Sequence, residues 1–523
     1  MTKPTMMSRR EFVTRLGILA FAPATGAGLS ACAVDSPLSS PSDMNQSQQL
    51  SLTATEAVSA IATGKLSAET YVRTLLERAN SLSNLRAFIT LNEGAVAAAR
   101  AVDAARAAGQ KLPALAGLPI VVKDNINTKD LPTTGGTPRL QKFQPNNDAV
   151  VLQRLLAAGA IVLGKANMHE LAFGITTTNF SPFAGFARNP YDPSRMVGGS
   201  SGGTGVAIAA RMAPVGLGTD TGGSVRIPAA LNGIAGLRPS VGNGGLERRY
   251  DGTGVIPLSH TRDTVGPMGR TLEDVALLDS VITGTEMPTA TSLSGLRFGI
   301  PATYWDVVDS EVLEVMNTAR TRLQAAGVTF VSVDMPTIRD LGAKVGFTVV
   351  FHEASLEIPS YLAASGGSDI TLTQIAEAIA SPDVKAGFAN VGSAESMAAY
   401  PDAVKVHRPQ MRALFDAYFA SNRIDAIFAP MTPLPAVPID PANGSSTVSV
   451  NGGPKVNEFG TFIRNADPGS ITGIPGVTVP AGRTGAGLPV GLALDGPVGS
   501  DKTLLSIGMA IEKLLGVLPA PNV

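Results

Sequence analysis

Short apolar runs alternate with helical patterns along the first half of the chain, and this alternation most constrains its fold. Residues 118–122 (LPIVV) form an apolar run of strand length, residues 150–158 have the spacing of a helix, and residues 160–163 (AIVL) form a second apolar run. Runs that are apolar throughout indicate strands buried on both faces. We therefore predict an α/β fold in which a long sheet is covered by helices on both sides.

The composition is that of a large globular enzyme with long loops. Apolar residues make up 44% and charged residues 16% of the 523 residues, enough for a sizeable core. Glycine (56) and proline (37) together form about 18% of the chain without a triplet period, which favours long site-building loops. Thr53 and Glu56 form a capping box at the start of a helix. No linker-like stretch interrupts residues 50–523, so we predict one large domain there.

Charge and residue usage exclude several classes of function. The formal net charge is −1 and no block of like charges is present, so no nucleic-acid partner is expected. One cysteine cannot build a disulfide framework or a cysteine-rich zinc site. Neither His169-Glu170 nor His352-Glu353 is followed by a second histidine at the spacing of a zinc-binding helix. We expect no metal and no cofactor, and the sequence predicts no oligomeric state.

The N-terminal segment, residues 1–31, is predicted to be an export signal. Residues 8–13 (SRREFV) resemble a twin-arginine motif, and residues 29–32 (LSAC) resemble a lipobox whose Cys32 is acylated. The apolar run between them is too short and too interrupted to remain as a membrane span. Residues 32–49 then form a polar tether. These features predict an exported, periplasmic or cell-envelope lipoprotein that meets the membrane only through Cys32.

Two further segments match known motifs in part. Gly159 to Lys165 imitates a phosphate-binding loop, but position 166 is alanine and the intervening residues read as a strand. Residues 198–202 (GGSSG) match the nucleophile elbow of α/β-hydrolases, which requires a histidine base. Three histidines lie downstream, so a Ser-His-Asp triad stays open at this point: His260, His352 and His407.

Two glycine- and serine-rich clusters carry the clearest functional signal. Residues 198–203 (GGSSGG) and 218–226 (GTDTGGSVR) follow a strand-borne Lys123. Together with residues 476–480 (GVTVP) and 487–491 (GLPVG), they resemble the amidase signature family from about residue 50 to the C-terminus. The resemblance implies that family's fold, with one large mixed β-sheet covered by helices on both faces, and its hydrolysis of C–N bonds in linear amides.

The resemblance also assigns roles to individual residues. It implies that Ser224 is the nucleophile, Ser200 the bridging cis-serine and Lys123 the base. A serine hydroxyl needs a base within hydrogen-bonding distance, and a lysine serves only when neutral. Its pKa must fall from about 10.4 to near neutrality, a change equivalent to about 4 kcal/mol. Burial at the end of an apolar strand shifts the pKa in this direction. In this scheme Lys123 takes a proton from Ser200, and Ser200 takes one from Ser224.

The second cluster provides further candidates. Its backbone amides are predicted to form an oxyanion hole, the interaction that usually contributes most in acyl transfer; they belong to Thr221, Gly222, Gly223 and Ser224. Three neighbouring side chains are expected to hold the loop in place: Thr219, Asp220 and Arg226.

The expected substrate is a small amide. Residues 168–176, 259–265 and 462–468 most resemble the aryl-acetamide-cleaving members of the family, the indoleacetamide and mandelamide hydrolases. Three residues of the first segment are then predicted to line the acyl pocket: Ala172, Phe173 and Ile175. One alternative is an anilide or aryl-carbamate (urethane) hydrolase of the same mechanism. An alternative of another class is a lipoprotein that binds amides without hydrolysing them.

Overall fold

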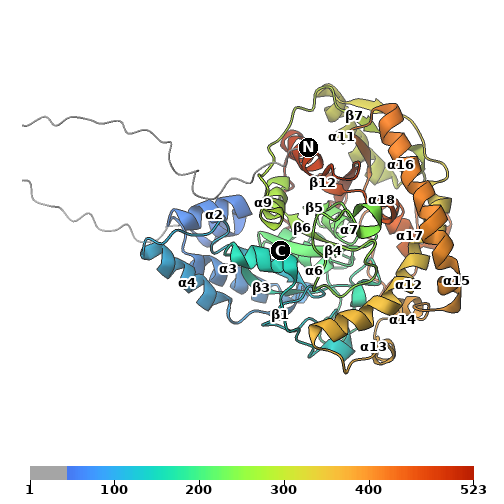
Figure 1. Cartoon of the computed structure of the whole chain (residues 1–523). Coiled ribbons are helices and arrows are strands. Elements are labelled where there is room, and N and C mark those ends of the chain that lie inside the picture. The colour runs from blue at the N-terminus through green and yellow to red at the C-terminus, as the bar shows by residue number, and fades with distance from the viewer. Residues whose placement is uncertain (1–43) are drawn as a thin grey trace, which may run out of the picture. The chain divides into compact units, whose positions relative to one another are not determined.

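A sheet of 11 strands runs through the centre of the computed structural model, which describes residues 44–523 (Figure 1). Its strand order is β1-β3-β2-β4-β6-β5-β12-β13-β9-β7-β8, and β10 and β11 form a separate hairpin. The bounds are β1 Phe88–Leu91, β2 Pro119–Lys123, β3 Ile161–Ala166, β4 Val215–Asp220, β5 Ala235–Arg238, β6 Thr264–Gly269, β7 Arg297–Gly299, β8 Thr329–Val331, β9 Ala426–Pro430, β10 Thr447–Ser449, β11 Lys455–Asn457, β12 Gly476–Arg483 and β13 Pro489–Asp495.

The sheet is mixed. Strand β2 pairs in parallel with both β3 and β4, and β7 pairs in parallel with both β8 and β9. The stretch from β4 through β6, β5, β12 and β13 to β9 is antiparallel throughout. The predicted α/β class with one large mixed sheet is confirmed.

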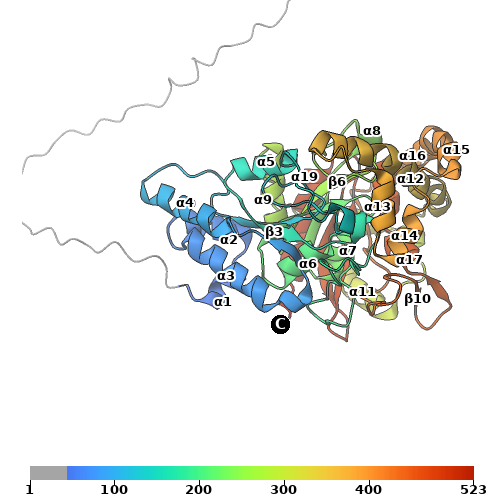
Figure 2. The same cartoon turned by 90° about the horizontal axis from the view of Figure 1, so that it is seen from below.

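Helices surround the sheet, as Figures 1 and 2 show. Their bounds are α1 Gln46–Ser51, α2 Ala54–Ala62, α3 Ala68–Ser81, α4 Ala95–Ala107, α5 Val150–Ala157, α6 Gly202–Ala209, α7 Arg226–Leu231, α8 Gly242–Gly245, α9 Leu272–Thr283, α10 Ala302–Trp305, α11 Ser310–Ala325, α12 Ile338–Ser365, α13 Leu372–Ala378, α14 Pro382–Phe388, α15 Ala394–Asp402, α16 Arg408–Asn422, α17 Glu458–Ile463, α18 Asp467–Thr472 and α19 Asp501–Leu515, with the short turns η1 Ser83–Leu85, η2 Pro138–Leu140, η3 Glu170–Ala172 and η4 Ala403–His407.

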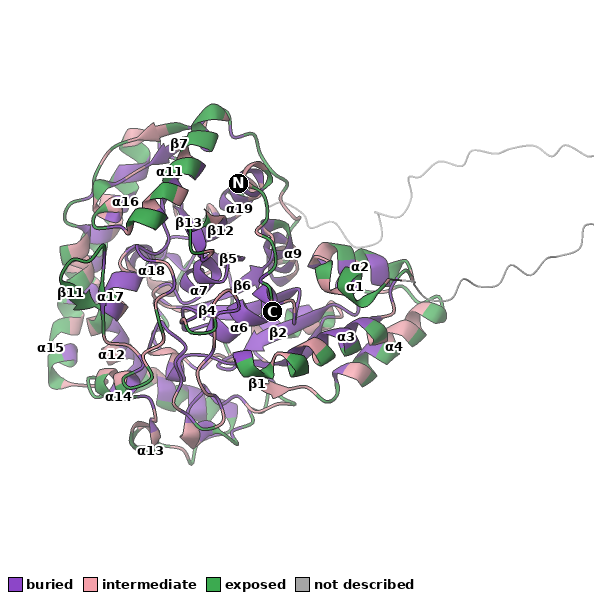
Figure 3. Cartoon of the chain, turned by 180° about the vertical axis from the view of Figure 1, so that it is seen from behind, coloured by how far each residue is buried: buried purple, intermediate pink, exposed green. Residues whose placement is uncertain are grey.

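Strand β12 illustrates why the central strands are apolar on both faces. Val477 and Val479 belong to the same apolar cluster as Leu504 of α19. Thr478 lies between them in sequence, so it faces the other side, where its hydroxyl donates to the carbonyl of Arg226 at the start of α7. Helices therefore cover both faces, and the buried interior and exposed outer helices are visible in Figure 3.

The local predictions compare closely with the observed elements. The run at 118–122 is strand β2, the pattern at 150–158 is α5, and Thr53 and Glu56 form the expected capping box of α2. One boundary differs: the predicted tether ends at residue 49, but α1 already begins at Gln46. Asn45 and Gln48 form a capping box there. The tether is predicted from the polarity of the segment alone, which does not reveal this motif.

The N-terminal predictions lie outside the described residues. This holds for the export signal at 1–31, for Cys32 and for most of the tether. Within residues 44–523, the helices are too short or too polar for any of them to cross a membrane.

Candidate active site

Lys123 is placed by strand pairing. It is the last residue of β2, which runs parallel to β4, so the carboxyl ends of the two strands meet at one edge of the sheet. Its Nζ atom lies 2.7 Å from Oγ of Ser200 and 2.7 Å from Oγ1 of Thr219. Asn125 donates to the same Thr219 hydroxyl at 3.0 Å. The structure thus joins the lysine to the first serine of the motif.

Burial lowers the pKa of Lys123 to about 7, although the negative charges of Asp220 and Asp263 act in the opposite direction. The side chain is completely buried. Its two closest polar neighbours are hydroxyl groups, which do not stabilise the ammonium form as a carboxylate would. A neutral amine in this position can accept a proton from Ser200.

Ser200 lies just before helix α6, and the peptide bond between Gly199 and Ser200 is cis. The backbone here is tightly enclosed. A Cβ atom on Gly203 would lie 2.3 Å from the carbonyl oxygen of Asn167, so only glycine fits. The amide of Ser201 donates to the carbonyl of Ser224 at 3.1 Å, which joins the two serine clusters directly.

Ser224 lies in the loop between β4 and α7, and its hydroxyl makes no hydrogen bond within residues 44–523. Of the four predicted oxyanion amides, those of Thr221, Gly222 and Ser224 donate to no acceptor in this part of the chain. The amide of Gly223 is different, because it donates to Asp220 at 2.9 Å. The prediction for Gly223 is therefore corrected: its amide holds the loop, and its φ of +123° requires glycine.

Asp220 organises this loop. Its carboxylate accepts from the amides of Gly223 and Val225 and from the guanidinium groups of Arg226 and Arg238. Burial alone would raise the pKa of Asp220, but the two arginines hold it well below its usual range. Asp220 and Arg226 thus fix the loop as expected, whereas Thr219 lies closer to the chemistry than expected, against Lys123.

Sequence reasoning missed a second set of supports. Asp263 accepts from the Thr221 hydroxyl at 2.6 Å, and Arg262 donates to the Thr221 carbonyl at 3.1 Å. Arg262 also forms an ion pair with Asp467, which lies next to Gly222. In the sequence, the segments at 259–265 and 462–468 stand out only by their resemblance to known hydrolases. Their contact with the nucleophile loop could not be read from the sequence.

An apolar pocket opens beside Ser224. The predicted residues Ala172, Phe173 and Ile175 all line it. Several lining residues that were not predicted come from elements far away in the sequence: Phe347 and Val350 on α12, Phe459 and Ile463 on α17, and Leu258. Phe347 is 44% exposed and stacks on Phe351, so it stands at the edge of the pocket.

A larger cavity of about 930 Å³ lies next to this pocket. The two share Ala172, Thr221 and Leu258 as lining residues. Thr219 and Asn125, the partners of Lys123, line the larger cavity only. The site therefore has two chambers that meet at the nucleophile loop.

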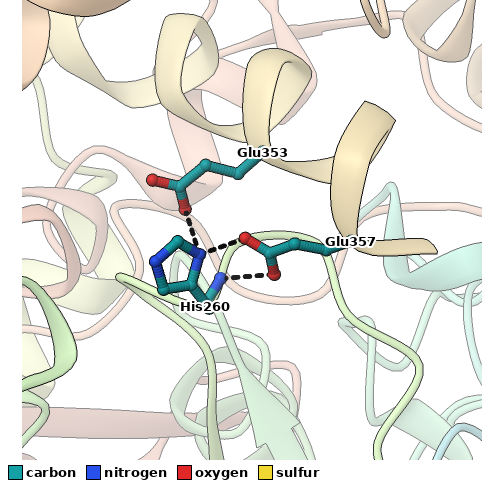
Figure 4. Close-up of side chains that lie close together, drawn as sticks. All are labelled: His260, Glu353 and Glu357. Atoms are coloured by element: carbon teal, nitrogen blue, oxygen red, sulfur yellow. Dashed lines mark hydrogen bonds and ion pairs between the residues drawn. The ribbon is translucent and has the colours of Figure 1, made fainter. Parts of the chain in front are cut away.

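The three histidines considered for a serine triad have other partners, although His260 lines the larger cavity. Figure 4 shows His260 between Glu353 and Glu357 of α12, with its Nδ1 atom 3.6 Å from Glu353 and hydrogen-bonded to Glu357. His352 stacks on Tyr400, and His407 contacts Gln410. No hydrogen bond joins any of them to Ser200 or Ser224 within the described chain, so a Ser-His-Asp triad is not formed.

The cluster in Figure 4 also offers ligand atoms within 4.8 Å of one another for a metal ion. Its groups are already matched by protein partners. Glu353 accepts from the hydroxyls of Ser259, Thr261 and Tyr400, and the hydrogen bond that His260 donates to Glu357 raises the pKa of His260. The cluster therefore fastens the loop at 259–263 to α12 without needing an ion.

Two other sequence candidates are structural. Lys165, the end of the phosphate-loop imitation, is buried in β3 and lies 3.3 Å from Asp124. His169 accepts from the amides of Thr176 and Thr177 and lies 3.1 Å from Asp383. Lys165 also donates to the carbonyls of Ile126 and Pro132, and the backbone amide of His169 donates to the carbonyl of Ser200.

Comparison with known proteins identifies the class. Residues 70–505 match the Amidase family, and the chain belongs to it. It is 39% identical to a mandelamide hydrolase of Pseudomonas putida, covering 90% of this chain and 93% of the relative. It is 38% identical to an indoleacetamide hydrolase of Agrobacterium vitis, covering 86% of this chain and 94% of the relative.

A solved structure agrees with these relatives. The native peptide amidase of Stenotrophomonas maltophilia superposes with a TM-score of 0.73 at 28% identity, covering 90% of this chain and 98% of that one. The protein is therefore an amidase that hydrolyses amides, and the alternative of a non-catalytic amide-binding lipoprotein finds no support.

The low pKa of Lys123 predicts a pH dependence. Below about pH 7 the amine is protonated and cannot accept a proton, so kcat/KM should rise through pH 7 and level off above it. Initial rates of amide hydrolysis between pH 5.5 and 9 test this. A profile that is flat across this range, or that falls through pH 7, would contradict a neutral Lys123.

Proposed function

We propose that this amidase hydrolyses small amides whose acyl part carries an aromatic ring, by way of an acyl-enzyme on Ser224. The observation that carries the proposal is the apolar pocket beside Ser224, whose edge is formed by Phe173, Phe347 and Phe459. The names of the mandelamide and indoleacetamide relatives support it, because both substrates place an aromatic ring in the acyl part.

In the proposed mechanism, neutral Lys123 accepts a proton from Ser200 as Ser200 accepts one from Ser224. The alkoxide of Ser224 attacks the amide carbonyl, and the free amides of Thr221, Gly222 and Ser224 stabilise the oxyanion. The relay then runs in reverse and protonates the departing amine. A water molecule repeats the sequence on the ester and releases the acid.

Substitution of the relay tests this mechanism. Lys123→Ala and Ser224→Ala should each lower kcat by about 10³-fold or more, and Ser200→Ala nearly as much, because the three act as a unit. His260→Ala is the matched control, since its side chain fastens a nearby loop but lies outside the relay. Purified variants whose circular dichroism spectrum matches that of the wild type should be assayed at one pH. A folded His260→Ala enzyme as inactive as Ser224→Ala would revive a histidine mechanism.

The larger cavity supports a second candidate. An anilide or aryl carbamate has its ring on the amine side of the carbonyl, and the cavity of about 930 Å³ provides room beyond Thr221. We favour the aryl-acetamide class because the apolar pocket reaches Ser224 itself, whereas the larger cavity does not include it among its lining residues.

Substrate comparison separates the two candidates. We expect kcat/KM for phenylacetamide or indole-3-acetamide to exceed that for acetanilide and a matched N-phenyl carbamate. Burial of the ring contributes roughly 2–3 kcal/mol and acts mainly on KM. Phe347→Ala should accordingly raise KM for phenylacetamide more than for acetamide, with Leu356→Ala, at an exposed position of the same helix outside the pocket, as the control. A tenfold or greater preference for the anilide and carbamate would select the second candidate.

We also propose that the enzyme is exported by the twin-arginine route and anchored through an acylated Cys32. The support is the order of basic residues, apolar run and cysteine in residues 1–32. This proposal concerns the export and anchoring of the enzyme and does not depend on the catalytic mechanism.

Two substitutions test the export proposal. Joint Arg9→Lys and Arg10→Lys should leave the enzyme in the cytoplasm, and Cys32→Ala should abolish labelling with a radioactive fatty acid. Arg15→Lys, outside the motif at 8–13, is the control. Recovery of the wild type from the cytoplasm with Met1 intact would contradict the proposal.

A further inference from the structure

A small cavity at the opposite end of strands β4 and β6 contains two arginine side chains. Arg211 follows α6, Arg270 follows β6, and both line a cavity of about 10 Å³. In the β4–β6 pair, Val215 lies opposite Gly269, whereas Asp220 lies opposite Thr264. The cavity is therefore separated from the nucleophile loop by the length of the strands, and it is a different site.

Only one nitrogen of the Arg270 guanidinium group has a hydrogen-bond partner among the described residues. The side chain is 4% exposed, and Nη1 donates to the carbonyl of Leu50 at 2.8 Å. Its Nε and Nη2 atoms are buried and have no hydrogen-bond partner in the described part of the chain. Buried donors without acceptors are costly, so these two nitrogens indicate a missing acceptor.

Arg211 adds a second positive charge to the same place. Its guanidinium group makes no hydrogen bond to any residue from 44 to 523. Burial and then the charge of Arg270 lower the pKa of Arg211 to about 10, so Arg211 is still cationic at neutral pH. Two neighbouring positive charges in a partly buried environment are costly unless a negative charge lies close to them.

Two carboxylates, Asp274 and Glu56, act on the charge of Arg270 from nearby. Among the described residues neither forms an ion pair of 4 Å or less with Arg211 or Arg270, and the Oδ1 atom of Asp274 already accepts from the amide of Thr55. Burial raises the pKa of Asp274 to about 6, so its carboxylate is mostly ionised at neutral pH and offsets part of the arginine charge from a distance. The guanidinium groups themselves still have no ion-pair partner within the described residues.

We propose that this cavity binds a single-atom anion of the size and charge of chloride, held between the guanidinium groups of Arg211 and Arg270. The volume admits about one water-sized particle, which excludes a sulfate or phosphate ion. Residues 517–520 close the cavity, and Tyr191 donates to the carbonyl of Pro519 in this segment at 3.2 Å. The anion joins the end of α6, the β6–α9 connection and the C-terminal segment, and so stabilises the folded chain by mass action.

A bromide-exchanged crystal of the full-length enzyme tests the site directly. Bromide replaces chloride and gives an anomalous signal, so a peak is expected between Arg211 and Arg270. A water molecule is the competing occupant, because it would bridge Arg270 to the unpartnered Oδ2 atom of Asp274. Ordered density without an anomalous peak, or bromide peaks only elsewhere, would overturn the proposal.

Thermal unfolding in solution provides the second test. The midpoint for the wild type should rise with sodium chloride concentration, relative to sodium gluconate of equal ionic strength. Arg211→Gln should abolish this difference. Arg100→Gln, at a side chain 62% exposed in a surface ion pair, should retain it. An equal chloride effect in Arg211→Gln and the wild type, or no chloride effect in the wild type, would contradict the site. Because Arg211 is only partly buried, its variant is expected to fold and to keep amidase activity.

Discussion

The carboxylate of Asp220 holds the catalytic loop in its shape, and the geometry of the site depends on it. Two backbone amides and two arginines converge on this one side chain at the end of β4. Because burial alone would penalise the charge, removal of either arginine would leave an anion poorly compensated inside the core. The loop carrying Ser224 is therefore fixed by electrostatics as well as by its glycines.

Two buried lysines of the same sheet differ in the groups that surround their amines. Lys165 faces Asp124 at 3.3 Å and also donates to two backbone carbonyls, so its charge has partners. Lys123 has hydroxyl neighbours instead, and its pKa falls to about 7. Both residues are completely buried. Burial lowers the pKa of both amines, but Asp124 opposes this shift at Lys165. Of the two, Lys123 is the one that contacts Ser200.

The sequence identified the three candidate reacting residues because each belongs to a short local motif. Lys123 ends an apolar strand, and Ser200 and Ser224 lie in glycine-rich clusters of unusual composition. The pocket was predicted only in part, because Phe347 and Phe459 come from helices with no such motif. The ion pair between Arg262 and Asp467 spans 205 positions in the chain and was missed for the same reason. The role assigned to the Gly223 amide was wrong because Asp220, three residues earlier, accepts it.

By itself, the sequence determined the class of fold and the start of individual helices, and it singled out the lysine and the two serines as candidates. These properties follow from local patterns: apolar runs, capping residues and close glycine spacing. Only the tertiary structure decided which amides of the nucleophile loop have no internal acceptor, which histidines are held by other partners and how two chambers meet at Thr221. It also brought Arg211 and Arg270 to one cavity. Such contacts depend on the order in which strands pair, and strand order is set by packing of the whole sheet rather than by any short segment of it.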